Sequence, residues 1–387
     1  RIQLLLLLIK KLSGLYIHIP FCRKACNYCD FHFSTQLNSM NRMVQGLAKE
    51  LKLRSSTPKI TIETIYFGGG TPSILTEKAL DFLMETIKTC YNVSTSAEIT
   101  LEANPDDINA EKALSWKRSG INRLSIGIQT FNDKILKILN RSHTANQALK
   151  SIELVRQAGF QNISADLMFA LPDSNDAVLK ADLKTLISLD FPHLSIYGLT
   201  IEENTVFGRW KIQNKQVFPS DIDYERNYRM VHEVLTQHHY EHYEVSSFTK
   251  KKKFSLHNTS YWLQNSYLGI GPGAHSFDGE YRSQNVSNNQ QYLKNLDFGH
   301  IQQTSEALSL TEKMNEYIML RLRTYFGLDF MLFKKKFHRD IKSEHVKLID
   351  QICLEGLAFL EKNKLKLTFD GFLINDEICT RLFYPTP

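Results

Sequence analysis

Hydrophobic and polar residues alternate in blocks along the first half of the chain. Short apolar segments end in polar or glycine-rich turns, and each is followed by a segment whose apolar residues recur at helical spacing. The apolar segments predict β-strands at residues 15–19, 64–67, 97–101, 123–128, 163–169 and 193–199. The intervening segments predict helices near residues 36–53, 77–89, 109–119, 133–139, 146–158 and 177–189. Strands that alternate with helices predict a parallel sheet, and six units are two fewer than a closed eight-stranded barrel needs. We therefore expect an α/β fold built on an open, partial (β/α)6 barrel.

The alternation stops after about residue 200. A helix is predicted near residues 222–237, a strand near 243–248 and a glycine-rich turn at 269–273. Helical spacing returns from about residue 308, and a hairpin is predicted around 365–374 with its turn at Asp370 and Gly371. These changes divide the chain into a non-functional extension (1–14), a core barrel (15–220), a barrel extension (221–307) and a mainly helical C-terminal domain (308–387) that packs on the barrel.

Composition narrows the class of protein. The 387 residues are 42% hydrophobic and 23% charged, which is typical of a globular protein rather than a disordered or fibrous one. The net charge is +6, and no stretch interleaves bases with aromatic residues, so no nucleic-acid partner is expected. The longest aliphatic run, residues 4–9, is far shorter than the roughly 18 to 20 residues that cross a bilayer, and it lacks the features of a secretory signal.

Three of the six cysteines, Cys22, Cys26 and Cys29, lie within eight residues. A tight cluster in a long chain indicates metal or redox chemistry in a reducing compartment rather than a disulfide framework, so we expect a cytoplasmic protein. The C-x3-C-x2-C spacing provides three thiolates, one fewer than a four-iron cluster binds, which would leave one iron open to a ligand. The alternative is a tetrahedral zinc ion with His18 or His32 as its fourth ligand, although no second C-x2-C pair is present.

Polar residues gather where the predicted strands end, and active sites in barrels collect at that side. In chain order the exits carry the cysteine cluster, the turn Gly68, Gly69, Gly70, Thr71 and Pro72, and then Glu102, Gln129, Asp166, Tyr197 and Thr200. The glycines could expose backbone N–H groups to a ligand, or simply form a tight turn. Glu102 could accept a hydrogen bond from a ligand ammonium, or begin a helix. Gln129, Arg141 and Asp166 could contact a polar ligand, or lie solvated at the surface.

The segment YIHIPFC, residues 16–22, together with Cys26, Tyr28 and Cys29, resembles the radical S-adenosylmethionine (SAM) superfamily. More narrowly, it resembles the branch of oxygen-independent coproporphyrinogen III dehydrogenases (HemN) and the related heme chaperones (HemW), from about Leu15 to the C-terminal domain. The resemblance implies that the three cysteines hold a [4Fe-4S] cluster whose fourth iron is chelated by SAM. It also implies cofactor contacts from Tyr16, Tyr28, Gly69, Gly70, Thr71, Glu102, Gln129, Arg141 and Asp166.

Two features favour the heme-chaperone branch. Phe31 stands where the dehydrogenase pattern continues with a further cysteine. Residues 257–262, HNTSYW, match the HNxxYW signature of that branch, which implies heme contacts from His257, Asn258, Tyr261 and Trp262. A histidine can ligate heme iron and aromatic rings can pack on the macrocycle, although the same residues could fill a buried loop. Residues 267–276, YLGIGPGAHS, also fit the family and are expected to fold back near the SAM end of the barrel.

The resemblance implies a heme chaperone that binds the cluster, SAM and heme and delivers heme to client hemoproteins. The alternative is an enzyme that oxidatively decarboxylates coproporphyrinogen III, and a zinc-stabilised binding module without redox function is a third possibility. Four lysines at residues 250–253 form a solvated loop, or could meet heme propionates, an acidic partner or an anionic membrane surface.

Overall fold

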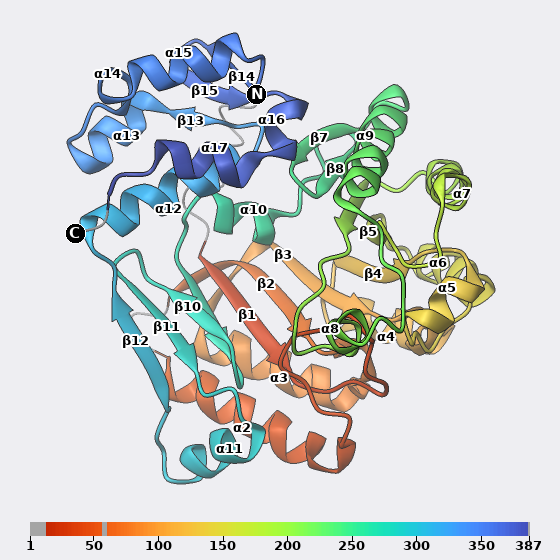
Figure 1. The fold of residues 1–387 in the computed structure, drawn as a ribbon. Helices are drawn as coiled ribbons and strands as arrows, with labels where there is room; N and C mark the ends of the chain where they lie inside the picture. Colours follow the sequence, from red (N-terminus) through yellow and green to blue (C-terminus); the bar gives the residue numbers. More distant parts are fainter. Residues whose placement is uncertain (1–12, 56–59, 386–387) are drawn as a thin grey trace.

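A computed structural model describes residues 13–55 and 60–385. Within these residues, the centre of the fold is a sheet of twelve strands in the order β12-β11-β10-β9-β1-β2-β3-β4-β5-β6-β8-β7 (Figure 1). Its central strands are β1 (Gly14–Ile19), β2 (Thr61–Gly69), β3 (Asn92–Ala103), β4 (Arg123–Gln129), β5 (Asn162–Phe169) and β6 (His193–Gly198). Neighbours in this series pair in parallel. The predicted α/β class with an open parallel sheet is confirmed. The predicted extension at 1–14 lies mostly outside the described residues, except that Gly14 begins β1.

Helices connect the parallel strands at the predicted places. They are α2 (Met40–Leu53), α3 (Glu77–Cys90), α4 (Ala110–Arg118), α5 (Asp133–Ile138), α6 (Ala145–Gln157) and α7 (Asp176–Ser188). From α3 onward, each begins after a Thr or Asn whose side chain accepts a hydrogen bond from a backbone N–H of the first turn. These caps satisfy N–H groups that have no partner within the helix. Short 3-10 turns, η1 (Leu37–Ser39), η2 (Pro72–Ile74) and η3 (Pro105–Asp107), complete the connections.

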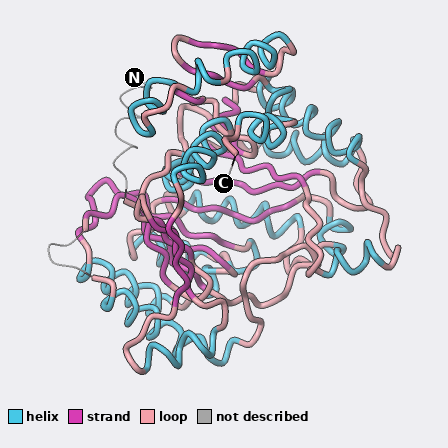
Figure 2. The backbone as a smooth tube through the Cα atoms, turned by 60° about the vertical axis from the view of Figure 1, so that its left-hand side comes forward, coloured by secondary structure: helices cyan, strands magenta, loops and turns pink. Residues whose placement is uncertain are grey.

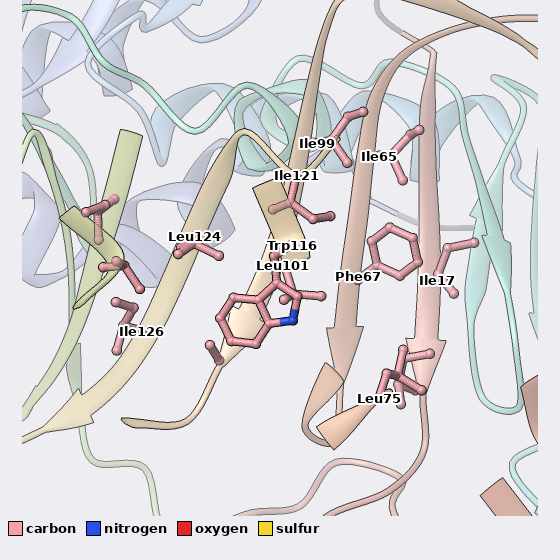
Figure 3. Close-up of a cluster of buried hydrophobic side chains, with 14 of the residues drawn as sticks. Ile17, Ile65, Phe67, Leu75, Ile99, Leu101, Trp116, Ile121, Leu124 and Ile126 are labelled. Carbon is pink, nitrogen blue, oxygen red and sulfur yellow. The ribbon is translucent and has the colours of Figure 1, made fainter. Parts of the chain in front are cut away.

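The two faces of the parallel strands differ in chemistry. Apolar side chains such as Ile17, Phe67 and Leu124 are fully buried and lie on the side of Trp116 of α4 (Figure 3). Polar residues occupy the alternate positions, and Ser125 of β4 bonds across to β5. Because successive side chains of a strand point to opposite faces, one face of the sheet forms the core and the other lines the inside of the barrel.

Later segments extend both edges of this sheet. β9 (Tyr267–Ile270) pairs in parallel with β1, and β10 (His275–Phe277), β11 (Tyr281–Asn285) and β12 (Gln303–Ala307) continue it in antiparallel pairing. At the other edge, β8 (Ser247–Thr249) and β7 (Glu241–Glu244) follow β6. The single strand predicted at 243–248 is therefore two strands joined by a turn. The helices of this region are α8 (Val206–Ile212), α9 (Asp221–Gln237), α10 (Leu256–Trp262) and α11 (Asn289–Asp297).

The C-terminal domain has its own hydrophobic core and lies above the sheet in Figures 1 and 2. Its helices are α12 (Leu310–Leu322), α13 (Phe330–Phe337), α14 (Ile341–Glu344), α15 (Val346–Leu354), α16 (Phe369–Leu373) and α17 (Asn375–Leu382). They surround a small sheet formed by β13 (Leu328–Asp329), β14 (Ala358–Glu361) and β15 (Lys364–Leu367). None of the helices in residues 13–55 and 60–385 is long and apolar enough to cross a membrane.

The hairpin predicted at 365–374 is wrong in position. The observed hairpin joins β14 to β15, and Lys362 in its turn has a positive φ of 57°. Asp370 and Gly371 instead lie in α16, where a Cβ on Gly371 would come within 2.0 Å of the Leu357 carbonyl oxygen. The glycine is required by close packing rather than by a turn, and the Asp-Gly pair misled the prediction.

Candidate functional site

The carboxyl ends of the parallel strands and the loop after β1 enclose a cavity of about 370 Å³, which we name the strand-exit cavity. Its volume lies in the range typical of small-molecule sites. Every predicted cluster and SAM residue except Tyr16 lines it: Cys22, Cys26, Tyr28, Cys29, Gly69, Gly70, Thr71, Glu102, Gln129, Arg141 and Asp166. Of the other four residues expected at the strand exits, Tyr197 lines it, and Gly68, Pro72 and Thr200 do not.

The three clustered cysteines are free thiols and are half-buried. The Thr71 hydroxyl donates to the sulfur of Cys22, and Nη1 of Arg141 donates to the sulfur of Cys26, each at 3.3 Å. Burial raises the pKa of Cys22 and that of Cys29 to about 11, so a bound metal must displace their protons. Three soft sulfur donors beside a cation fit an iron–sulfur cluster, whose net negative charge the guanidinium would offset.

The zinc alternative has less support in this geometry. In the part of the chain that the structure describes, no three His, Cys, Asp or Glu side chains are placed to hold a single metal ion. His18 donates from Nε2 to the His32 carbonyl oxygen at 2.8 Å, and its Nδ1 accepts from the Tyr16 hydroxyl at 3.2 Å. Both of its ring nitrogens are therefore engaged in positioning the loop after β1. The cysteines of a four-iron cluster bind different irons and need not converge on one point.

Arg141 connects the cysteine loop to the sheet. Its Nη2 donates to Oδ1 of Asn104 and to the carbonyl oxygen of Gly127, both at 2.8 Å. Its Nε is buried and has no hydrogen-bond partner among the described residues. A buried donor without a partner is uncommon and is typical of a site completed by a ligand.

Two carboxyl groups face the same cavity. Glu102 accepts a hydrogen bond from the Tyr66 hydroxyl at 2.7 Å, and both oxygens of Asp166 accept from Ser125 at 3.1 Å. Burial raises the pKa of Glu102 to about 7, and the nearby Asp166 charge adds to this effect; burial also raises the pKa of Asp166 to about 6. A cationic ligand group would stabilise both carboxylates, so the cavity favours such a group.

The glycine turn after β2 has the features of the tight turn, the second of the two interpretations of these glycines. The N–H groups of Gly70 and Thr71 donate to the carbonyl oxygens of Ile19 and Phe21 at 2.9 and 2.8 Å, so these two amides are not free for a ligand. A Cβ on Gly70 would lie 2.5 Å from the Phe21 carbonyl oxygen. The turn is therefore built for close packing against the exit of β1, and it holds the start of the cysteine loop in place.

Sequence reasoning missed Arg123, the largest fully buried side chain in the described residues. It begins β4, and its Nε and Nη1 have no hydrogen-bond partners in the described residues. Its positive charge lowers the pKa of Glu102 and of Asp166 and so opposes the effect of burial. The available signal was an arginine at the start of an otherwise apolar and small-residue strand.

The predicted heme motif lies in α10, not in a loop. His257 is fully buried; its Nδ1 lies 2.8 Å from the Thr64 hydroxyl and its Nε2 lies 2.7 Å from the Tyr261 hydroxyl. Burial lowers the pKa of His257 to about 3. Trp262 packs under the Arg323 guanidinium, and Asn258 is half-buried. Iron ligation by His257 would require at least one of its two ring hydrogen bonds to break.

A larger cavity of about 850 Å³ lies between β1, the loop after it, the end of α10, β9–β11 and α12, and we name it the lateral cavity. Phe31 lines both cavities and is 73% exposed. Tyr16 lines the lateral cavity, as does Tyr261 alone among the four heme-motif residues. Residues 267–276, which were expected to fold back onto the barrel, pair with β1 through β9, and Tyr267 and His275 of this segment line the lateral cavity.

The sequence of the chain was compared with family models and with known proteins. The Radical SAM superfamily model matches residues 16–186, and the HemN C-terminal domain model matches residues 308–374. The chain is similar to the heme chaperone HemW of Bacillus subtilis, with 33% identity over 371 residues that cover 95% of this chain and 98% of that protein. It is 32% identical to the heme chaperone HemW of Lactococcus lactis, over 96% of this chain and 97% of that one.

The fold is also that of a solved structure, the Escherichia coli coproporphyrinogen III oxidase HemN, a radical SAM enzyme. The TM-score is 0.83 and the identity 23%, and the match covers 98% of this chain and 93% of HemN. The chain belongs to the radical SAM superfamily and, within it, to the HemW family. Membership in the superfamily implies a [4Fe-4S] cluster and SAM as cofactors.

Proposed function

We propose that this protein is a heme chaperone that binds a [4Fe-4S] cluster, SAM and heme and passes heme to client hemoproteins. The observation that carries the proposal is the similarity to the Bacillus subtilis heme chaperone HemW along nearly the whole of both chains. Phe31 supports it, because the dehydrogenase pattern has a further cysteine at this position.

Cys22, Cys26 and Cys29 would hold the cluster, which when bound supplies an iron with an open position for SAM. Arg141 donates to one of the thiols and offsets their negative charge when they are deprotonated. Glu102 would accept from the ammonium group of SAM; in support, it lines the same cavity, and a cation would favour its charged form. Asp166, Gln129 and the remaining polar lining would orient the rest of the cofactor.

The heme motif would act through the wall of the lateral cavity. His257 holds the hydroxyl of Tyr261, whose ring faces this cavity and packs edge-on against Tyr267 with centroids 4.6 Å apart. Flat apolar ligands pack on such aromatic walls. Among the four adjacent lysines, Lys250 pairs with Asp190, whereas residues 251–253 are exposed and are the candidate contact for an acidic partner or an anionic membrane surface.

The experiment is a heme titration of anaerobically reconstituted protein, followed by incubation with coproporphyrinogen III, SAM and reductant. We expect heme to bind, with a saturable change in its absorbance, and coproporphyrinogen III to remain unchanged. Multiple-turnover conversion to protoporphyrinogen would overturn the chaperone proposal in favour of the enzyme. Stoichiometric zinc without labile sulfide, in protein purified without oxygen, would support the third possibility instead.

A further inference from the structure

The lateral cavity has the size and the lining of a site for a flat, mostly apolar ligand. Its volume of about 850 Å³ lies in the upper part of the range for small-molecule sites. Its walls carry the rings of Tyr16, Tyr261, Tyr267 and Phe277, and Phe31 lies at its border with the strand-exit cavity. In contrast with the strand-exit cavity, it contains no cysteine among its lining residues.

Three histidines line this cavity, and they differ in what their rings already bind. Both ring nitrogens of His18 are engaged, as described above. Nε2 of His32 lies 2.8 Å from Oδ1 of Asn289 and donates to it, which leaves only Nδ1, next to the histidine's own backbone. The ring of His275 is exposed and makes no hydrogen bond to any described residue. Neither of its ring nitrogens is therefore engaged by another described residue, and His275 lines the cavity.

The sheet holds His275 in position even though its ring is free. His275 lies on β10 and pairs with Gln284 of β11, which lines the same cavity. Phe277, two residues further along β10, lines the cavity as well, because alternate residues of a strand share a face. Desolvation and the nearby Arg282 charge lower the pKa of His275, and only the neutral ring is a metal ligand.

From this arrangement we propose that the lateral cavity receives the heme macrocycle and that His275, rather than His257, supplies the ligand to the heme iron. The inference rests on the proposed heme-chaperone function and names the site for it. His257 then acts as a positioning residue, since it is buried and bonds the hydroxyl of Tyr261 at the cavity wall. The macrocycle would lie next to Phe31, and hence next to the cavity that holds the cysteines.

The test of the ligand compares His275→Ala with two matched variants in reconstituted full-length protein. His32→Ala removes another cavity histidine, and His300→Ala removes an exposed histidine that does not line the cavity. Each protein is titrated with heme and with iron-free protoporphyrin IX. We expect His275→Ala to lower heme affinity by about tenfold or more and to change the heme absorbance spectrum. Its protoporphyrin IX affinity should match that of the wild type, because no iron is present to ligate.

Four outcomes are decisive. Heme binding by the wild type with an unchanged spectrum and affinity in His275→Ala would overturn the ligand assignment while leaving the proposed function intact. Loss of the spectrum in His32→Ala but not in His275→Ala would also overturn it. An equal loss of affinity for heme and for protoporphyrin IX in His275→Ala would show that His275 contacts the macrocycle as part of the cavity wall and does not ligate the iron. Absence of heme binding in the wild type would refute the proposed function itself.

A second pair of variants tests the cavity. Gln284 faces the lateral cavity, whereas its neighbour Ser283 faces the opposite side of β11 and lines a different cavity. Gln284→Trp should fill the lateral cavity and lower the affinity for both heme and protoporphyrin IX, and Ser283→Trp should lower neither. Cluster content, measured as iron and labile sulfide, verifies that each variant is folded. Equal affinities in the two tryptophan variants would place the macrocycle elsewhere.

Discussion

The strand-exit cavity and the lateral cavity share Phe31 but are constructed differently. The strand-exit cavity is lined by residues 22–197, all from the repeating strand and helix units or their loops. The lateral cavity combines Tyr16 of β1 with Tyr267 and Arg282 of the added strands and with Leu320 of the C-terminal domain. A site at the exits of parallel strands follows from the fold class, whereas a site between the barrel and later additions depends on how those additions pack.

The two cavities also differ in the chemical groups that line them. Thiols, carboxyl groups and Arg141 line the strand-exit cavity, which suits a charged cofactor bound to a metal cluster. Aromatic rings line the lateral cavity, together with His275, whose ring makes no hydrogen bond to any residue that the structure describes; this lining suits a planar ligand. Their contact at Phe31 means that a ligand in one lies close to a ligand in the other.

The largest effect expected is loss of the cluster. Cys22→Ser, Cys26→Ser or Cys29→Ser should each abolish it, because these thiols provide the only cysteine donors that line the strand-exit cavity. Cys353→Ser, in α15 of the C-terminal domain, is the matched control and should retain full iron and labile sulfide. A cluster-free Cys353→Ser protein, or an intact cluster in one of the other three, would contradict the assignment.

Replacing His257 should destabilise the protein much more than replacing His275. His257→Ala removes a fully buried ring with two hydrogen bonds and should reduce the free energy of unfolding by about 2 to 4 kcal/mol. His275→Ala removes an exposed ring and should change it by less than about 0.5 kcal/mol. Denaturant unfolding of the two variants measures both values. Equal losses would mean that His275 is as structural as His257.

SAM binding should distinguish the carboxyl groups of the two cavities. Glu102→Ala removes a charged acceptor in the strand-exit cavity and should weaken SAM by about 1.5 to 3 kcal/mol, with the cluster retained. Glu316→Ala removes a carboxylate of the lateral cavity, where it pairs with Arg282, and should leave SAM affinity unchanged. Calorimetric titration of cluster-replete protein would compare them. If Glu102→Ala binds SAM as tightly as the wild type does, Glu102 has a structural role and does not contact SAM.

The last prediction concerns pH. The pKa of Glu102 is raised by burial to about 7 from its usual 4.5, so the folded protein holds a proton that the unfolded chain has released between these values. The contribution of Glu102 to stability is therefore most favourable below pH 4.5 and decreases as the pH rises through 7. Glu102→Gln should raise the Tm of cofactor-free protein at pH 8 and not at pH 4. A rise of the same size at both values would assign the effect to packing.

Much of the fold follows from local patterns. Each of the six predicted parallel strands overlaps an observed one, since alternating strands and helices leave few arrangements for a parallel sheet. The polar residues at the strand exits could be found for the same reason, because these exits meet at one side of the barrel. Their assignment to a cluster and to SAM came from the resemblance to the radical SAM superfamily. The misplaced hairpin near Gly371 shows the limit of local signals. The sequence does not distinguish a glycine that is required for close contact with Leu357 from a glycine that is required for a turn.

The sequence by itself determined the α/β class, the cysteine loop and the polar strand exits, because periodicity and spacing act over a few residues. The tertiary structure alone decided which ring nitrogens are occupied. His257 and His275 are both histidines of family motifs, yet one is buried against Thr64 and Tyr261 and the other stands free on β10. The contact between Thr64 and His257 joins residues that are 193 positions apart in the chain. Contacts over such separations depend on packing, which no local pattern encodes.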